Sequence, residues 1–129
     1  SNLIKQYPTD IVCLGIGENG HIAFNDPPVA DFCDKHIIKS VKLDEICRNQ
    51  QVHDGCFEKT DDVPTHALTL TVPTLFSGRH LFCVVPAITK ADAVYKMLND
   101  DINEKCPATI LRKHKSAVLY CDKDSASKL

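Results

Sequence analysis

The chain has 129 residues, of which 43% are hydrophobic and 25% charged, and its formal net charge at pH 7 is -2. These values are typical of one compact globular domain and exclude a disordered or fibrous chain. Lys and Arg form no basic stripe, and no apolar run approaches the ~20 residues that span a bilayer, so we expect no nucleic-acid partner and no membrane insertion. The start of the sequence lacks the pattern of a secretory signal, so we expect a cytoplasmic protein.

Five short runs have the length and composition of β-strands. Most are apolar throughout rather than alternating, which is typical of strands in a parallel sheet that helices cover on both faces. The sequence therefore predicts an α/β, Rossmann-like fold with a mostly parallel sheet flanked by helices. The runs are residues 11–16, 36–43, 66–72, 80–86 and 116–121.

Four helical segments are expected between these strands, at residues 43–51, 73–77, 89–99 and 107–113. In the third, Thr89 is the predicted N-cap, and Ala91, Val94, Tyr95 and Leu98 recur at helical spacing to form one apolar face. The polar residues 55–64 are typical of a surface loop. The charged tail, residues 122–129, is either a terminal helix or a frayed end.

The chain contains seven cysteines, an odd number with wide spacing and no C-x-x-C pair. We expect reduced thiols, several of them buried, because Cys13 and Cys83 lie inside apolar runs. Structural zinc sites usually draw on closely spaced ligand pairs, so no metal site is predicted.

The most distinctive segment is residues 15–27, directly after the first predicted strand, where ligands bind in open α/β sheets. Gly15, Gly17 and Gly20 match the G-x-G-x-x-G pattern of dinucleotide-binding proteins. That pattern needs a long helix starting within the glycines, whereas Pro27 and Pro28 would interrupt it after about two turns. We instead expect a loop whose glycines let a small ligand approach the main chain.

Three polar side chains of this loop could form an acid/base group. A carboxylate on one imidazole nitrogen fixes the tautomer and leaves the other nitrogen free for proton transfer. This pattern assigns His21 as the acid/base, Asp26 as the residue that orients it and Asn19 as a polar partner. The residues alone equally allow His21 and Asp26 to cap short helical turns.

The segment Leu14-Gly15-Ile16-Gly17-x-Asn19-Gly20-His21-Ile22-Ala23-Phe24-Asn25-Asp26-Pro27 resembles the active-site signature of glucosamine-6-phosphate deaminases. The similarity continues through residues 63–70, 90–94 and 111–117. The resemblance implies that residues 1–129 are the C-terminal part of a single sugar-phosphate deaminase/isomerase domain, and hence an incomplete sheet.

By the same resemblance, glucosamine 6-phosphate would be converted to fructose 6-phosphate and ammonia. His21 would open the sugar ring with support from Asn19 and Asp26. Gly17, Gly20 and Lys90 would bind the substrate, with Lys90 at the phosphate. A solvated lysine in a first helical turn is the alternative for Lys90.

The proposed proton transfers require no metal and no organic cofactor. The expected partner is a small-molecule sugar phosphate, and the resemblance leaves a homo-oligomer open. The other five histidines are interpreted as structural or surface residues.

Several features depart from the family pattern. Asn19 stands where many members have aspartate, and Asp26 replaces the usual glutamate. An arginine that binds phosphate is expected near residues 53–55, where none occurs, and Arg48 is the nearest. The family's phosphate loop and aspartate base lie upstream, so the isolated chain is expected to be inactive.

Two other functions stay open from the sequence. One is a hydrolase of the 6-phosphogluconolactonase type, and the other is a non-catalytic sugar-phosphate-binding module. The choice between glucosamine and galactosamine 6-phosphate is also open.

Overall fold

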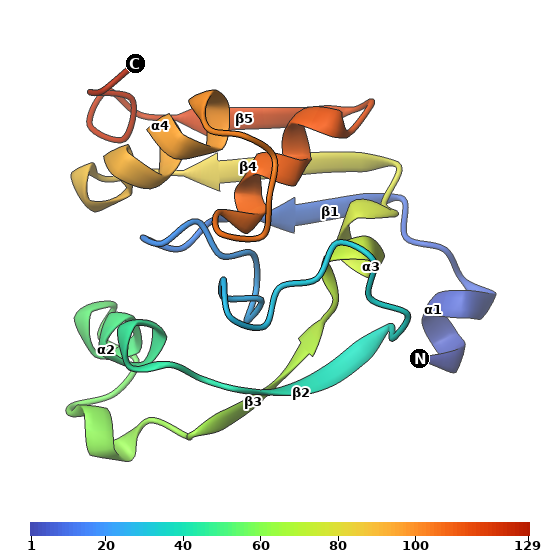
Figure 1. Ribbon diagram of the computed structural model, residues 1–129, viewed down its shortest axis with the longest axis horizontal. Helices are drawn as coiled ribbons and strands as arrows, with labels where there is room; N and C mark the ends of the chain where they lie inside the picture. The colour runs from blue at the N-terminus through green and yellow to red at the C-terminus, as the bar shows by residue number, and fades with distance from the viewer.

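The computed structural model describes residues 1–129 and contains two separate sheets (Figure 1). Helices alternate with strands along most of the chain, as the sequence predicted. The elements in chain order are α1 (Asn2–Gln6), β1 (Ile11–Leu14), β2 (Ile38–Lys42), α2 (Glu45–His53), the 3₁₀ turn η1 (Thr60–Asp62), β3 (His66–Leu70), α3 (Val72–Phe76), β4 (His80–Val85), the 3₁₀ turn η2 (Ile88–Lys90), α4 (Ala91–Asn99), the 3₁₀ segment η3 (Pro107–Lys113) and β5 (Ala117–Cys121).

The larger sheet has the strand order β1-β4-β5, and both pairings are parallel. Ile11 lies opposite His80, and Leu81 lies opposite Ala117. All three strands therefore end at the same edge of the sheet, where ligand sites of open α/β sheets form (Figure 1). The predicted α/β class is confirmed.

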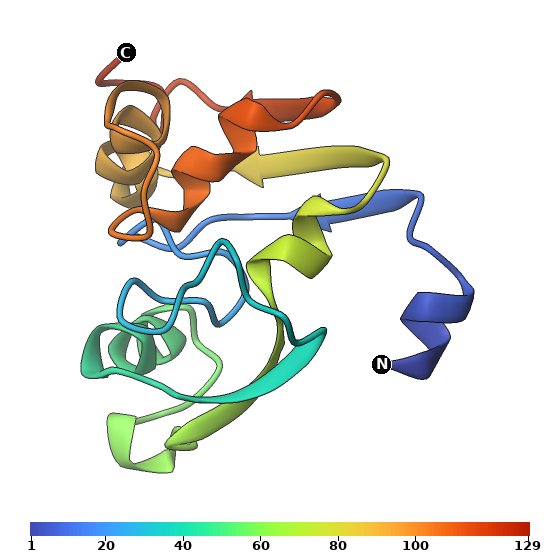
Figure 2. The same ribbon diagram turned by 45° about the vertical axis from the view of Figure 1, so that its right-hand side comes forward.

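The core lies on one face of this sheet, under α4 and η3 (Figures 1 and 2). Alternate strand residues point into it, including Leu81, Cys83 and Val85, and they meet Val94 of α4 and Leu111 of η3. Burial of such side chains contributes about 1.5–3 kcal/mol each. The same packing holds the loops at the carboxyl ends of the strands in place.

The opposite face of the larger sheet is open in this structure. Ile11 is 57% exposed and Val84 is 55% exposed, and the rings of Phe82 and Tyr120 stack at 6.5 Å on the same face. Cys13 also belongs to this face and is exposed, so the expectation that it would be buried like Cys83 is wrong. The apolar run was read correctly as a strand, but helices cover only one of its faces here.

The strands β2 and β3 form a separate antiparallel pair, with Ile38 opposite Leu70 and Lys42 opposite His66. Their expected place in one parallel sheet is therefore corrected. The physical reason is visible in β2, where Lys39, Ser40 and Lys42 surround the buried Val41, a half-buried pattern that suits an antiparallel pair.

The N-cap of helix α4 lies one residue later than the sequence indicated. Lys90 is its N-cap residue, with no side-chain cap, and Thr89 lies in the preceding turn η2, so the Thr89 cap is wrong. The buried face includes Val94 and Met97, whereas Tyr95 is 45% exposed. Met97 belongs to the core cluster that also contains the inward-facing residues of β4, so this side of the helix faces the sheet.

The C-terminal residues 122–129 form turns rather than a helix. The Asp122 carboxylate accepts hydrogen bonds from the backbone N–H of Ser125 at 2.7 Å and of Ala87 at 3.0 Å, which ties this segment to the end of β4. None of the helices in the structure has both the length and the apolar character needed to cross a membrane.

Candidate functional site

The loop that follows β1 folds back on itself through short backbone hydrogen bonds. The Gly17 N–H donates to the His21 carbonyl at 3.0 Å, and the Gly20 N–H donates to the Gly17 carbonyl at 2.9 Å. The Gly20 carbonyl accepts from the Ala108 N–H of η3 at 2.9 Å. The loop is therefore closed internally and anchored to the segment that also covers the core.

Both glycines of this loop are required by their surroundings. A Cβ on Gly17 would lie 2.0 Å from the His21 Cε1 atom, so the imidazole ring rests directly on the Gly17 backbone. Gly20 has φ +80°, and a Cβ there would lie 2.5 Å from the Cys106 Sγ atom. A side chain at Gly17 would displace the histidine, and one at Gly20 would strain the backbone.

The structure brings Asn19, His21 and Asp26 into direct contact. The His21 Nδ1 atom lies 2.8 Å from Asn19 Oδ1 and 3.0 Å from Asp26 Oδ1. Asn19 Nδ2 donates to Asp26 Oδ1 at 3.0 Å, and Asn19 Oδ1 also accepts from the His21 backbone N–H at 3.0 Å. These interactions form a closed group of three side chains.

The group fixes the tautomer of His21. Both oxygens next to Nδ1 are acceptors, because Asn19 turns its amide nitrogen toward Asp26, so Nδ1 carries the proton. Nε2 then has a free lone pair in the neutral imidazole. The His21 side chain is 11% exposed, and the arrangement suits proton exchange with a small bound ligand.

Asp26 stays ionised within this group although it is only 2% exposed. Burial by itself raises the pKa of Asp26, but the hydrogen bonds from His21 and Asn19 hold the pKa below its ordinary value. An ionised Asp26 stabilises a protonated imidazole by its negative charge, whereas the neutral Asn19 stabilises it only by accepting a hydrogen bond.

Asn25 fixes the far side of the loop to β3, a role that the sequence did not reveal. It is fully buried, and its Nδ2 donates to the carbonyls of Ile22 at 2.9 Å and Leu70 at 2.8 Å. The Phe24 N–H also donates to Thr69 Oγ1 at 3.2 Å. The sequence signal for this anchoring is an amide residue that directly follows the apolar stretch 22–24.

Lys90 lies at the carboxyl end of β4, in η2, on the sheet edge that also carries the loop after β1. It forms no ion pair, and it is half-buried. No hydrogen bond or ion pair joins Lys90 to His21, although both lie at this edge of the sheet.

Arg48 lies elsewhere and is already bonded. Its guanidinium donates to the carbonyls of Thr60 at 2.6 Å and Val63 at 3.1 Å, which fastens α2 to the segment before β3. Both bonds come from Nη2 of Arg48, and they hold the guanidinium against the backbone of that segment.

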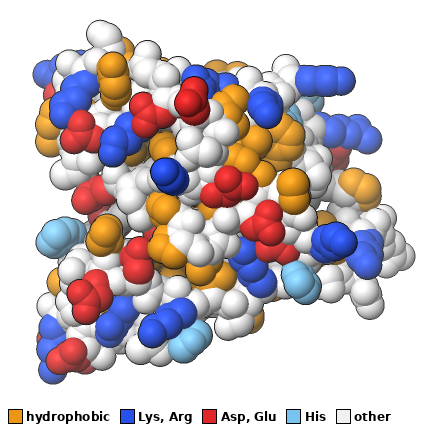
Figure 3. All heavy atoms as spheres, in the orientation of Figure 1, with side chains coloured by type: hydrophobic (Ala, Val, Ile, Leu, Met, Phe, Trp, Pro, Cys, Tyr) orange, Lys and Arg blue, Asp and Glu red, His pale blue; other side chains and the backbone are white.

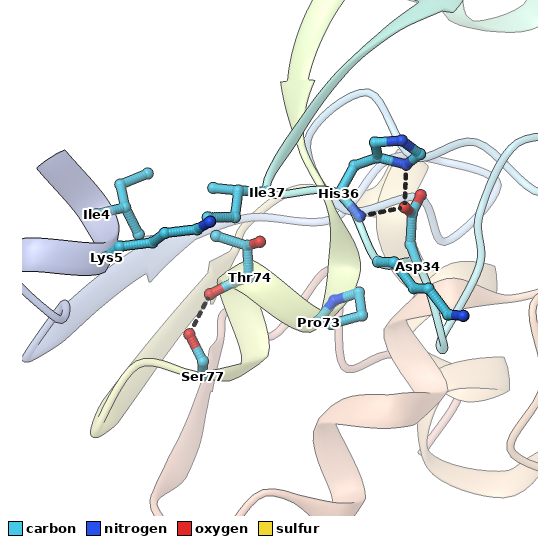
Figure 4. Close-up of a pocket in the computed structure, with 9 residues that line it drawn as sticks. Ile4, Lys5, Asp34, His36, Ile37, Pro73, Thr74 and Ser77 are labelled. Atoms are coloured by element: carbon cyan, nitrogen blue, oxygen red, sulfur yellow. Dashed lines mark hydrogen bonds and ion pairs between the residues drawn. The ribbon is translucent and has the colours of Figure 1, made fainter. Parts of the chain in front are cut away.

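The cavities of the structure lie away from the histidine. The one drawn in Figure 4 measures about 280 Å³ and lies between α1, residues 34–37 and α3. Its carboxylate, Asp34, already accepts from the His36 backbone N–H and from Lys39, whose Nζ lies 2.8 Å away. Acidic and basic side chains intermix over the face in Figure 3, and no group of three His, Cys, Asp or Glu side chains is arranged to bind a metal.

Comparison with known proteins gives a consistent result, although no family model matches the chain. Glucosamine-6-phosphate deaminase of Bacillus cytotoxicus is 38% identical over 97% of this chain, and the enzyme of the same name from Exiguobacterium sibiricum is 36% identical over 98%. A monomeric glucosamine-6-phosphate deaminase of known structure superposes with a TM-score of 0.91 at 35% identity, over 99% of this chain.

A second group of structures shares the fold alone. The 6-phosphogluconolactonase of Trypanosoma cruzi superposes with a TM-score of 0.68 at 22% identity, over 95% of this chain and 42% of its own length. Both the sequence identity and the superposition are lower than those of the deaminase.

The chain spans about half the length of these relatives, covering 46% of the Bacillus enzyme, 48% of the Exiguobacterium enzyme and 52% of the deaminase of known structure. The similarity extends over nearly all of residues 1–129, including the loop that holds Asn19, His21 and Asp26. Over residues 1–129 this chain is therefore homologous to the corresponding half of the glucosamine-6-phosphate deaminases.

Proposed function

We propose that this chain provides the ring-opening histidine of an enzyme that converts glucosamine 6-phosphate and water to fructose 6-phosphate and ammonia. The observation that carries the proposal is the closed contact of Asn19, His21 and Asp26, which keeps the proton of neutral His21 on Nδ1. The relatives named as deaminases support the choice of reaction.

His21 would act through its free Nε2 atom. Opening the sugar ring removes a proton from the anomeric hydroxyl and delivers one to the ring oxygen, and a neutral imidazole can do both in turn. Ionised Asp26 would stabilise the imidazolium formed between these steps, as a carboxylate behind a catalytic histidine does. Asn19 would hold the ring in position.

The substrate phosphate is assigned to Lys90. A half-buried lysine without a carboxylate partner, on the sheet edge that carries the His21 loop, suits a phosphate dianion. Gly17 and Gly20 would let the sugar approach the backbone of the loop. The movement of a proton between sugar carbons needs a further base, and we propose that residues outside 1–129 supply it, so the isolated chain is inactive.

The test is ammonia release from glucosamine 6-phosphate by the full-length protein that contains residues 1–129. The matched variants are His21→Ala and His114→Ala, because His114 lies in the segment before β5 and donates to or accepts from backbone groups only. We expect release by the wild type and the His114 variant, and a loss of at least about 10²-fold in kcat for His21→Ala.

Other substrates decide between the remaining functions. Turnover of galactosamine 6-phosphate in place of glucosamine 6-phosphate would identify the other epimer as the substrate. Turnover of 6-phosphogluconolactone alone would establish the lactonase function. Binding of glucosamine 6-phosphate without any turnover by the full-length protein would establish a non-catalytic binding module. Each of these outcomes would overturn the proposed reaction.

A further inference from the structure

The turn that carries Lys90 begins at a residue with an unfavourable backbone conformation. Ala87 lies just beyond β4 at φ 83° and ψ 148°, a combination that residues with a Cβ seldom adopt. Its carbonyl accepts a hydrogen bond from the Lys90 N–H at 3.1 Å, which closes the turn η2. The conformation of Ala87 therefore sets the direction in which the chain leaves the sheet toward Lys90. Such a conformation persists only where neighbouring groups hold it.

The group that holds Ala87 is the carboxylate of Asp122. The pairing of β4 with β5 runs as far as Val85 and Cys121, and the next residue, Pro86, has no N–H to extend it. The Ala87 N–H instead donates to Asp122 Oδ2 at 3.0 Å. A side chain thus continues the link between the two strands at the point where the chain turns.

The other oxygen of this carboxylate is fixed within its own turn. Asp122 Oδ1 accepts from the backbone N–H groups of Ser125 at 2.7 Å and Asp124 at 3.1 Å. Ser125 is fully buried, and its Oγ accepts from the Asp122 backbone N–H at 3.2 Å. The turn therefore orients the carboxylate, and Oδ2 is held facing Ala87.

A second contact joins the C-terminal turns to the chain on the other side of Lys90. These turns lie beside α4 (Figures 1 and 2), and Lys128 forms an ion pair with Asp92 in the first turn of that helix. Both side chains of the pair are largely exposed, so its contribution is small. The bond from Ala87 to a charged carboxylate is the stronger of the two constraints.

We infer that Asp122 is a positioning residue, which holds Ala87 in its strained conformation and thereby sets the place of Lys90 at the carboxyl edge of the sheet. Its effect on substrate binding rests on the proposed function, because it acts through Lys90. The conformation of residues 87–90 does not depend on the substrate. A role for Asp122 only within its own turn, without effect on Lys90, is the competing account.

The test uses three variants of the full-length protein. Asp122→Ala removes the bond to Ala87, and Ser125→Ala loosens the turn but keeps that bond. Asp124→Ala removes a negative charge from the same turn, where only its backbone N–H contacts Asp122. In amide hydrogen exchange, Asp122→Ala should speed the exchange of the Ala87 N–H about tenfold, because a hydrogen bond to a charged group is lost. The two controls should leave this exchange near the wild-type rate.

The kinetic readout separates substrate binding from the chemical step. We expect Asp122→Ala to raise KM for glucosamine 6-phosphate about tenfold and to keep kcat within about twofold of the wild type. In a Lys90→Ala background, the same substitution should raise KM by less than about twofold, since residues that act through one contact are not additive.

Unchanged exchange of the Ala87 N–H in Asp122→Ala would overturn the inference. An equal rise of KM in either control, or a full further rise in the Lys90→Ala background, would overturn it as well. Hydrogen exchange needs no substrate. A protein that released no ammonia would therefore refute the proposed function, and the Ala87 amide would still decide whether Asp122 holds the turn.

Discussion

Gly17→Ala should displace the imidazole ring of His21, the residue that we propose to be catalytic, while leaving the ring itself unchanged. The added Cβ would lie 2.0 Å from Cε1, 2.1 Å from Nδ1 and 2.5 Å from Nε2 of His21. To restore an ordinary contact of about 3.4 Å, the ring would have to move by about 1.4 Å, or the loop backbone would have to shift by as much. Either movement breaks the contacts of Nδ1 with Asn19 and Asp26, which are 2.8 and 3.0 Å long.

The cost of this displacement can be estimated for stability and for rate. Overpacking a buried site costs about 1–3 kcal/mol of unfolding free energy. A misplacement of about 1 Å in a reacting group can lower the rate about 10²-fold. We therefore expect Gly17→Ala to lose about two orders of magnitude in kcat while the protein stays folded.

The assay is ammonia release together with thermal unfolding, and Gly15→Ala is the matched control. Gly15 lies in the same loop, and a Cβ there would meet only the Val84 carbonyl oxygen, at 3.4 Å. The control should keep wild-type kcat. Wild-type kcat in Gly17→Ala, or an equal loss in both variants, would refute the argument that the Gly17 backbone positions the His21 ring.

Three further predictions concern stability and reactivity. Hydrogen bonds from Lys39 and from the His36 backbone N–H lower the pKa of Asp34 from 3.8 to about 2. This carboxylate therefore stabilises the fold above pH 3.8, and its contribution should vanish as the pH falls toward 2. Chemical unfolding at several pH values should show a weaker acid dependence in Asp34→Asn, and an unchanged dependence would contradict the assignment. Ala87 has φ 83° and ψ 148°, a conformation that favours glycine, so Ala87→Gly should raise the unfolding free energy by about 1 kcal/mol, and a lower melting temperature would argue against strain there. Four cysteines are exposed (Cys13, Cys33, Cys56 and Cys121) and three are buried (Cys47, Cys83 and Cys106). In the native 129-residue chain, a thiol reagent should modify the exposed cysteines quickly and the buried ones slowly. Fast modification of all seven would contradict the packing.

Most strands could be located from the sequence because apolar runs of strand length are local signals. Their pairing could not, because it depends on contacts between distant residues. The run around Val41 was assigned to the parallel sheet with the others, yet its lysines and serine mark a half-buried strand that pairs with β3. Cys13 shows the same limit, since a residue in an apolar run is buried only if another element covers its side of the sheet.

The contact of Asn19, His21 and Asp26 could be anticipated because all three lie in one short loop that glycines allow to fold back. The anchoring of the same loop by Asn25 could not be anticipated, because Asn25 donates to the carbonyl of Leu70, which lies 45 residues later in the chain. Arg48 is the arginine nearest in sequence to the expected phosphate arginine, and its bonds to two backbone carbonyls likewise depend on a segment that folds against α2.

The central claim is that His21 meets the substrate through Nε2 while its Nδ1 proton is held by Asn19 and Asp26. The most direct measurement is the ¹⁵N spectrum of the His21 imidazole in the full-length protein, recorded without and with saturating glucosamine 6-phosphate under conditions of slow turnover. The account predicts a protonated Nδ1 in the free protein and a substrate-dependent shift concentrated on Nε2. A proton on Nε2 in the free protein, or a ring whose two nitrogens do not respond to the substrate, would contradict it.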